Sequence, residues 1–236
     1  PMMMANAGGA AVSMRFGLQG PNETICTACA AGTHALNYAA RLIAWGQIDA
    51  AVSGGTEHAA TVTAIAGFGN MTALSSSGTS RPFDSGRDGF VMGEGAAAFV
   101  LEEWETAKAR GATILGEILG GASNADAYHI TAPSPGGVGA ITCMRLALED
   151  AGLEPGDIRQ INAHGTSTPL NDAAEAAAIA EVFGPDAVPV VSTKGVTGHA
   201  LGAAGALEAA AALLSIQHRL IPPTANTKVL DDDMRI

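Results

Sequence analysis

The chain has 236 residues and a formal net charge of −11, from 12 basic and 23 acidic residues. It is 47% hydrophobic, which is enough to bury a sizeable core, and it has no cluster of Lys or Arg, which argues against a nucleic-acid partner. The three cysteines lack the spacing of a disulfide framework, so we expect a reducing, cytoplasmic compartment. We also expect no signal peptide and no membrane span, because the apolar run over 201–216 is short and contains Glu208.

The first third of the chain predicts alternating helices and strands. A short helix is expected within 2–20, broken near Gly17, and is followed by a strand over 23–27. An Ala-rich run predicts a helix over 30–45 that is buried on most faces, because apolar residues surround its axis. A run over 48–53 that is rich in Ile, Ala and Val then predicts a strand covered on both faces.

The rest of the chain continues this alternation after an irregular stretch over 57–80, which contains a glycine-rich turn at Phe68. The elements predicted next are a strand over 94–101, a helix over 103–110, a strand over 114–120, a helix over 141–151, a strand over 158–163, a helix over 171–183, a strand over 188–192 and a helix over 202–219. Alternation of this kind indicates a layered α/β fold. The order strand, small-residue turn and Ala-rich helix occurs over both 23–54 and 188–222, which predicts a pseudo-twofold core with the two turns opposed at its centre.

Cys29 lies at the joint between the predicted strand 23–27 and the predicted helix 30–45. The unpaired N–H groups and the positive end of the helix dipole favour the thiolate there, and the thiolate is the nucleophilic form. Small neighbouring residues leave room for a substrate carbonyl. The structural alternative is a buried, inert cysteine. Cys26 is discounted as a redox or zinc partner, because no second C-x-x-C pair follows.

His164 follows the predicted strand 158–163 and begins a turn rich in Gly, Thr and Pro. A side chain at the carboxyl end of such a strand faces the crevice where α/β sheets bind ligands. The structural alternative is a histidine bonded to its own turn. Thr166 and Thr168 either cap this turn or hydrogen-bond an amide-bearing arm of a ligand.

His199 lies at a second strand–helix joint, shortly after Lys194. An ammonium group among apolar neighbours is unfavourable unless it is paired, and Glu208 on the next helix is the predicted partner. The glycines that follow do not have the G-x-G-x-x-G spacing, so nucleotide binding is a weak interpretation. A thiolate can accept an acyl group, and two neutral imidazoles can hold an enolate oxygen while one assists as acid or base. This set suits Claisen condensation better than proteolysis.

On these motifs the chain resembles the β-ketoacyl-acyl carrier protein synthases of the thiolase-like superfamily, and is most similar to the elongating type of fatty acid synthesis. The resemblance runs along essentially all 236 residues. The matching motifs are Thr27-Ala28-Cys29, Ser80-Arg81-Pro82-Phe83-Asp84 with Arg87-Asp88-Gly89-Phe90, Asp126-Ala127-Tyr128-His129, Asn162-Ala163-His164-Gly165-Thr166-Ser167-Thr168 and Thr193-Lys194-Gly195-Val196-Thr197-Gly198-His199.

The resemblance implies a layered α-β-α-β-α fold that is incomplete at both ends. About residues 1–120 would be the rest of the N-terminal half with the nucleophile, and about 121–236 the C-terminal half with both histidines. The chain expressed alone is then expected to fail in condensation and to aggregate or self-assemble, because buried strands expect sheet neighbours.

The same resemblance implies roles for single residues. Cys29 would accept the acyl group, and His164 and His199 would serve malonyl decarboxylation and condensation. Lys194 would orient the site electrostatically with support from Glu208, Thr166 and Thr168 would contact the phosphopantetheine arm, and Phe68 would line the acyl pocket. The backbone N–H of Cys29 would be one oxyanion donor, and the second would come from a glycine-rich loop after Ile236.

The implied reaction is a decarboxylative Claisen condensation between an acyl group on Cys29 and malonyl-acyl carrier protein. It implies acyl carrier protein as partner, a homodimer, and no metal or organic cofactor. One alternative is a polyketide-type ketosynthase with the same chemistry. Another is a non-catalytic chain-length partner subunit, which would lack the cysteine. A thiolase would need a second catalytic cysteine, and Cys143 stands in mid-helix outside any fitting motif.

Overall fold

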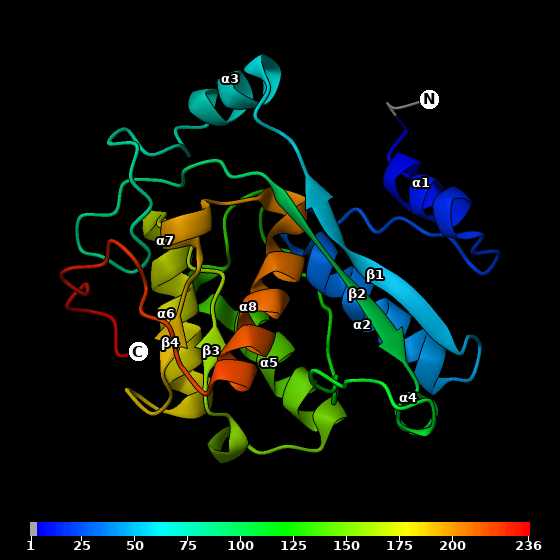
Figure 1. Cartoon of the computed structure of the whole chain (residues 1–236). Helices are drawn as coiled ribbons and strands as arrows, with labels where there is room; N and C mark the ends of the chain where they lie inside the picture. The colour runs from blue at the N-terminus through cyan, green and yellow to red at the C-terminus, as the bar shows by residue number, and fades with distance from the viewer. Residues whose placement is uncertain (1–3) are drawn as a thin grey trace.

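Two helices lie side by side at the centre of the molecule, with a pair of strands on either side of them (Figure 1). The computed structural model describes residues 4–236, so the first residues of the helix predicted within 2–20 lie outside it. The central helices are α2 (Ala31–Ala44) and α8 (Ala204–His218). An antiparallel ribbon of β1 (Ala50–Glu57) and β2 (Gly95–Glu102) packs against them.

The second pair of strands is parallel and short, and it lies beside α8. It consists of β3 (Ile161–Asn162) and β4 (Val190–Val191). Helices α5 (Val138–Ala151) and α6 (Pro169–Phe183) pack against each other beyond it. The main hydrophobic cluster fills this half with the buried residues Phe83, Ala163, Ala176, Ile179, Val188 and Met234. The layered α/β arrangement expected from the sequence is therefore present.

Glycines allow α2 and α8 to touch backbone to backbone at their first turns. A Cβ on Gly32 would lie 2.7 Å from the amide nitrogen of Ala206, and a Cβ on Gly205 would lie 2.6 Å from that of Thr33. Since real side chains do not approach so closely, both positions require glycine. The crossing brings together the turns that begin the two helices, as predicted, while the pseudo-twofold relation itself stays a prediction because residues 23–27 form no strand.

The structure corrects two predictions about burial. Helix α2 is buried along one stripe rather than on most faces, and this stripe contains Gly32, Leu36, Ala39 and Leu42. Strand β1 is not covered on both faces, because its burial alternates and Val52 is 45% exposed. Helices α2 and α8 pack on the β1–β2 ribbon, and helix α1 (Ala7–Phe16) approaches Thr56 of β1.

Several predicted elements differ in extent. Residues 23–27 and 114–120 form no strand, because neither segment finds a sheet partner among the described residues, and β3 and β4 are shorter than expected. Residues 57–80 are not irregular throughout but contain helix α3 (Val62–Asn70), because the Thr61 side chain accepts a hydrogen bond from the Ala64 N–H and caps it.

Two short elements agree with the sequence. Helix α1 (Ala7–Phe16) ends at Gly17, which has a φ of 67°, and α4 (Trp104–Ala109) follows β2. None of the helices described is long and apolar enough to cross a bilayer.

Candidate active site

Three predicted residues from distant segments meet at the centre of the molecule. The Sγ atom of Cys29 lies 2.9 Å from Nε2 of His199. The rings of His164 and His199 stand edge to face, with centroids 5.1 Å apart. One ligand atom from each of the three side chains lies within 4.8 Å of the other two. The structure thus assembles the thiol and the two imidazoles in one cluster.

Cys29 is presented by a sharp turn. It is the middle residue of a 3₁₀ turn, Ala28–Ala30, which leads directly into α2. Ala28 has a φ of 50°, a left-handed conformation that is unfavourable for a residue with a Cβ and is concentrated at functional sites. The helix start predicted next to Cys29 is therefore confirmed, but it follows an irregular segment and not the predicted strand over 23–27.

The protonation state of Cys29 differs from the one expected. Burial raises the pKa of the Cys29 thiol, although the Lys194 ammonium and the N–H of Cys29 itself act in the opposite direction. The sequence suggested a resting thiolate from the position at a helix start alone. The geometry favours a resting thiol, because the loss of water around the sulfur outweighs the nearby positive charge.

The two histidines are neutral. Burial, and then the charge of Lys194, lower the pKa of His199 to about 3, and the same causes lower the pKa of His164 well below 6.5. Nδ1 of His199 accepts a hydrogen bond of 3.3 Å from the N–H of Leu201. In the neutral ring the proton is therefore on Nε2, which faces Cys29. His199 can donate a hydrogen bond to the sulfur or to an oxygen beside it.

Lys194 is paired with Glu208, as predicted. Lys194 begins the short helix α7 (Lys194–Thr197), is only 1% exposed, and donates from Nζ to the Glu208 carboxylate. Burial raises the pKa of Glu208, while the Lys194 charge beside it opposes this. An ammonium held in this way keeps both imidazoles in the uncharged form at neutral pH.

Thr166 and Thr168 face each other across a tightly held turn. Their hydroxyl oxygens lie 2.8 Å apart, and Thr168 makes no side-chain cap to α6. Between them Ser167 has a φ of 68° and is fully buried. Its N–H donates to the Asp172 carboxylate at 3.1 Å. The hydrogen bond between the two hydroxyls lies within the turn, which agrees with the capping alternative, and Asp172 also holds the turn in shape.

Phe68 lies in helix α3 and not in a glycine-rich turn as predicted. Its ring packs edge to face on Phe90, with centroids 5.2 Å apart. The Phe90 ring in turn packs on His199 at 5.3 Å. Phe68 is thus connected to the site through one aromatic neighbour.

Glu175 is a site residue that the sequence analysis missed. Its carboxylate oxygens accept hydrogen bonds of 2.7 Å from the backbone N–H groups of both His164 and Gly165. Burial raises the pKa of Glu175, and these N–H donors lower it. The signal available in the sequence was an acidic residue inside an Ala-rich helix. Glu is almost never buried without partners, so such a residue indicates that partners exist. Glu175 fixes the backbone from which His164 projects.

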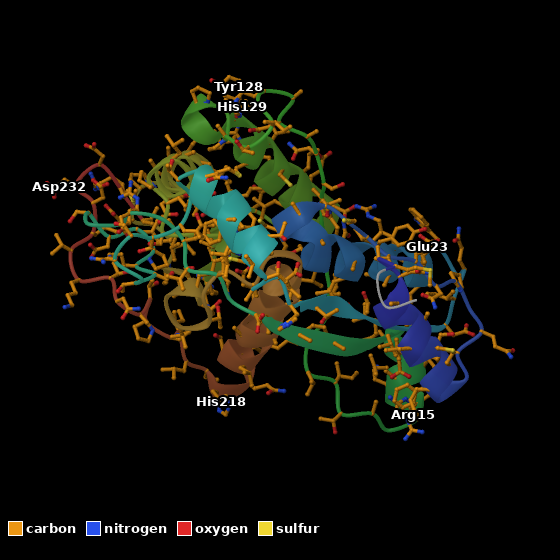
Figure 2. All side chains as sticks on the ribbon, turned by 90° about the horizontal axis from the view of Figure 1, so that it is seen from above. Arg15, Glu23, Tyr128, His129, His218 and Asp232 are labelled. Carbon is orange, nitrogen blue, oxygen red and sulfur yellow. The ribbon has the colours of Figure 1, made fainter. Side chains whose placement is uncertain are left out.

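The loop that carries the Asp126-Ala127-Tyr128-His129 motif remains at the surface, where Figure 2 labels Tyr128 and His129. Nδ1 of His129 accepts hydrogen bonds of 3.1 Å from the N–H groups of Thr131 and Ala132. In this structure His129 therefore shapes its own loop.

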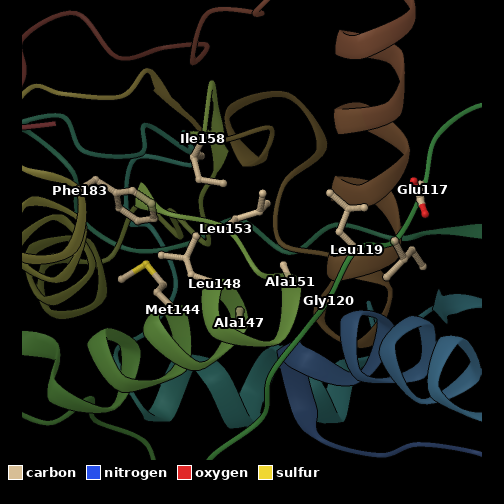
Figure 3. Close-up of a pocket in the computed structure, with 11 residues that line it drawn as sticks. Glu117, Leu119, Gly120, Met144, Ala147, Leu148, Ala151, Leu153, Ile158 and Phe183 are labelled. Atoms are coloured by element: carbon tan, nitrogen blue, oxygen red, sulfur yellow. The ribbon is translucent and has the colours of Figure 1, made fainter. Parts of the chain in front are cut away.

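Two cavities lie away from the central cluster. One has a volume of about 380 Å³ and lies between residues 117–120 and α5, with Ile158 and Phe183 also in its lining (Figure 3). The other, of about 350 Å³, lies between α7 and the end of α8, and Thr193 lines it next to Lys194. Neither is lined by Cys29, His164 or His199.

Comparisons with known proteins agree with this geometry. Residues 1–107 match the family described as "Beta-ketoacyl synthase, N-terminal domain" and residues 115–228 match "Beta-ketoacyl synthase, C-terminal domain". The chain is 48% identical to a 3-oxoacyl-[acyl-carrier-protein] synthase 2 of Coxiella burnetii, over 98% of this chain and 58% of the relative. It is 48% identical to the protein of the same name from Synechocystis, over 99% of this chain and 58% of the relative. The chain therefore spans about 58% of the length of these curated relatives.

Solved structures give the same result for the fold. A ketosynthase in complex with a type II polyketide acyl-carrier protein, AntDE:AntF, has a TM-score of 0.94 at 37% identity, over 97% of this chain and 58% of that chain. A β-ketoacyl synthase from Burkholderia phymatum has a TM-score of 0.93 at 41% identity, over 97% of this chain and 56% of that chain.

Proposed function

The chain belongs to the β-ketoacyl synthase family and has its thiolase-like layered fold, and from this premise we propose that the protein is a 3-oxoacyl-acyl carrier protein synthase of fatty acid elongation. The observation that carries the proposal is the approach of Cys29 Sγ to His199 Nε2 at 2.9 Å, with the His164 ring beside both. This arrangement supplies a nucleophile and two uncharged N–H donors, as a decarboxylative condensation needs.

The first step is acylation of Cys29. The Cys29 sulfur attacks the carbonyl carbon of an acyl thioester, the bond from that carbon to the carrier thiol breaks, and the proton of Cys29 goes to the leaving sulfur. The N–H of His199 stabilises negative charge on the Cys29 sulfur as the proton departs, and this compensates for the raised pKa of the buried thiol. The backbone N–H of Cys29 faces the developing oxyanion as one donor.

The second step is decarboxylation of malonyl-acyl carrier protein and condensation. The bond to the carboxylate breaks, CO₂ leaves, and the electron pair forms an enolate whose oxygen accepts hydrogen bonds from His164 and His199. The enolate carbon then attacks the acyl carbonyl on Cys29, the carbon–sulfur bond breaks, and Cys29 takes up one proton. Neutral imidazoles suit this step, because an imidazolium would hold the malonyl carboxylate as an ion pair and oppose its loss.

Three further residues position this machinery. Burial first, and then the charge of Lys194 held by Glu208, lower the pKa of both imidazoles. Glu175 holds the backbone of His164 through the two hydrogen bonds described above. A carboxylate that accepts two backbone N–H groups fixes a turn more firmly than either bond alone.

The substrate arm and the partners complete the proposal. The facing hydroxyls of Thr166 and Thr168 bind the amide groups of a phosphopantetheine arm, and Phe68 with Phe90 borders the acyl chain. The protein acts with acyl carrier protein, as the ketosynthase of the AntDE:AntF complex does, and it works as a homodimer in the cytoplasm. The free state of Cys26, Cys29 and Cys143 supports a reducing compartment.

A polyketide-type ketosynthase is the second candidate, because AntDE:AntF is such an enzyme and shares the fold at a TM-score of 0.94. Its identity to this chain is 37%, against 48% for the 3-oxoacyl synthase 2 of Coxiella burnetii. The fatty acid interpretation is therefore preferred. The presence of Cys29 argues against a non-catalytic chain-length subunit.

The test is mass spectrometry of the full-length protein after incubation with an acyl-acyl carrier protein. We expect one acyl adduct, on the peptide that contains Cys29, and its loss in Cys29→Ser. Cys26→Ser is the matched control and should acylate normally, because Cys26 is exposed and does not contact the histidines. An adduct that survives in Cys29→Ser would overturn the proposal.

A further inference from the structure

We propose that Cys29, His164 and His199 also form a binding site for a soft divalent cation such as Zn²⁺, and that the bound metal blocks the thiol reversibly. The metal has no part in the proposed condensation. Binding of the cation does not depend on the proposed function, and only the inhibition that would follow from it does.

The donor set is the first argument. Zinc in proteins is held by cysteine sulfur and histidine nitrogen, and sites with three protein ligands keep a fourth position for water. Within residues 4–236, no other group of three His, Cys, Asp or Glu side chains brings its ligand atoms together in this way. Softer ions such as Cd²⁺ prefer the same thiolate-containing sets.

The spacing is the second argument. A tetrahedral zinc with bonds of about 2.3 Å to sulfur and about 2.0 Å to nitrogen separates its ligand atoms by about 3.4–3.6 Å. The observed separations begin at 2.9 Å, between Cys29 and His199, and none exceeds 4.8 Å. Side-chain rotations that move each ligand atom by about one ångström or less therefore bring all three atoms onto one ion.

The third point is the proton balance. A histidine ligates metal only through a neutral nitrogen, and a cysteine ligates it only as the thiolate. On binding, the cation displaces the Cys29 proton to solvent, and the ring proton of His199 moves from Nε2 to Nδ1. This proton shift breaks the hydrogen bond from the N–H of Leu201, which is long at 3.3 Å.

Lys194 opposes the cation, but its charge is balanced. Its ammonium is paired with the Glu208 carboxylate, which balances its charge, and the Glu175 carboxylate lies on the backbone N–H of His164. The bound thiolate then compensates half of the metal charge. These charges predict that a chelator can remove the metal from the site, in contrast to a closed structural zinc site with four protein ligands.

A bound cation would inhibit the proposed reaction, because it would occupy the atoms that carry out the chemistry. A cation on Cys29 Sγ uses the electron pair that would attack the acyl thioester. The same ion occupies the two nitrogens that would donate to the enolate oxygen. Metal binding and condensation therefore exclude each other.

The experiment titrates the reduced full-length protein with Cd²⁺ and follows the thiolate-to-metal charge-transfer band in the ultraviolet. We expect one equivalent to bind, the band to vanish in Cys29→Ser, and His164→Ala and His199→Ala each to weaken binding by more than about tenfold, the lower limit for loss of a group that merely supports a ligand. Cys26→Ser and Cys143→Ser are the matched controls and should retain the band. Circular dichroism establishes that each variant is folded.

A band that persists in Cys29→Ser, or that disappears only in a control variant, would overturn the site. A second arm uses Zn²⁺, which should protect Cys29 from alkylation by iodoacetamide until a chelator is added. If the metal binds as described but the protein acylates no carrier thioester, the proposed function fails and the site stands. If the protein condenses normally and no band forms, the site fails alone.

Discussion

The turn that carries Cys29 and the turn that precedes α8 have the same construction. Each is a 3₁₀ turn that begins with a residue of positive φ, Ala28 at 50° and Leu201 at 43°, and each leads into a central helix. The two differ in where the reactive group lies. Cys29 is inside its turn, whereas His199 comes two residues before Leu201 and is held by it through Nδ1.

The supports of the two turns also differ. His199 follows β4 and α7, and the buried Lys194–Glu208 pair lies behind it. The segment before Cys29 has no strand partner within residues 4–236, so the Cys29 turn is held mainly by the close packing of α2 on α8. The histidine side of the site therefore depends on polar contacts, and the cysteine side depends on glycine-mediated packing. The substitutions below test this contrast.

The largest effect is expected for Cys29→Ala. It should abolish acylation and condensation together, because no other thiol in the described residues lies within reach of the two histidines. Acyl transfer and product formation with acyl- and malonyl-acyl carrier protein measure this. A variant that is folded and still condenses would rule out Cys29 as the nucleophile.

The next effect concerns the histidine side. His164→Ala and His199→Ala should each slow decarboxylation of malonyl-acyl carrier protein by on the order of 100- to 1,000-fold, because each removes one donor to the enolate oxygen. Acylation of Cys29 should suffer less, and should suffer more in His199→Ala than in His164→Ala, since His199 is the histidine that contacts the sulfur. Equal rates of CO₂ release in both variants and the parent would exclude the two-histidine arrangement.

The neutral state of the histidines predicts how stability depends on pH. His199 has a pKa of about 3 in the folded protein, against about 6.5 when it is exposed. As the pH falls, the unfolded chain therefore takes up a proton before the folded protein does. The free energy of unfolding should decrease progressively from about pH 6.5 toward pH 3, by on the order of a few kcal/mol. His164 adds to the decline in the same direction. Urea unfolding at several pH values measures this, and His199→Gln should flatten the curve.

The packing on the cysteine side is tested by a glycine pair. Gly205→Ala should destabilise the protein by about 1–3 kcal/mol, because the added Cβ would lie 2.6 Å from the Thr33 amide nitrogen at the helix crossing. Gly67→Ala is the matched control in α3, where nothing lies within 4 Å, and it should be neutral or stabilising by about 0.5–1 kcal/mol. Denaturant midpoints compare the two. A midpoint of Gly205→Ala that is no lower than that of the parent would show that the α2–α8 crossing tolerates a methyl group.

The sequence predicted the site better than it predicted the sheets. His164, Lys194 and His199 stood after predicted strands and Cys29 stood at a helix start, where local pattern determines position, and Glu208 was the acidic residue within reach on the following helix. The strands over 23–27 and 114–120 failed because a strand needs a neighbour, and an apolar pattern does not say whether one is available. Helix α3 was missed because its glycines outweighed the cap at Thr61. Glu175 was missed because its partners are backbone N–H groups, which the sequence does not reveal.

The smallest effect is expected at Phe68, which reaches the site only through Phe90. Phe68→Ala should leave acylation and decarboxylation intact and shift the preference among acyl chain lengths by about tenfold, the lower range of discrimination by a hydrophobic pocket. Removing the ring frees space beside Phe90 without changing either histidine. Ile65→Ala is the matched control, because Ile65 lies on the same helix and is 47% exposed. Competition between acyl-acyl carrier proteins of different length measures the profile. If Phe68→Ala and Ile65→Ala give the parental profile alike, Phe68 serves only to pack α3 on Phe90 and does not border the acyl chain.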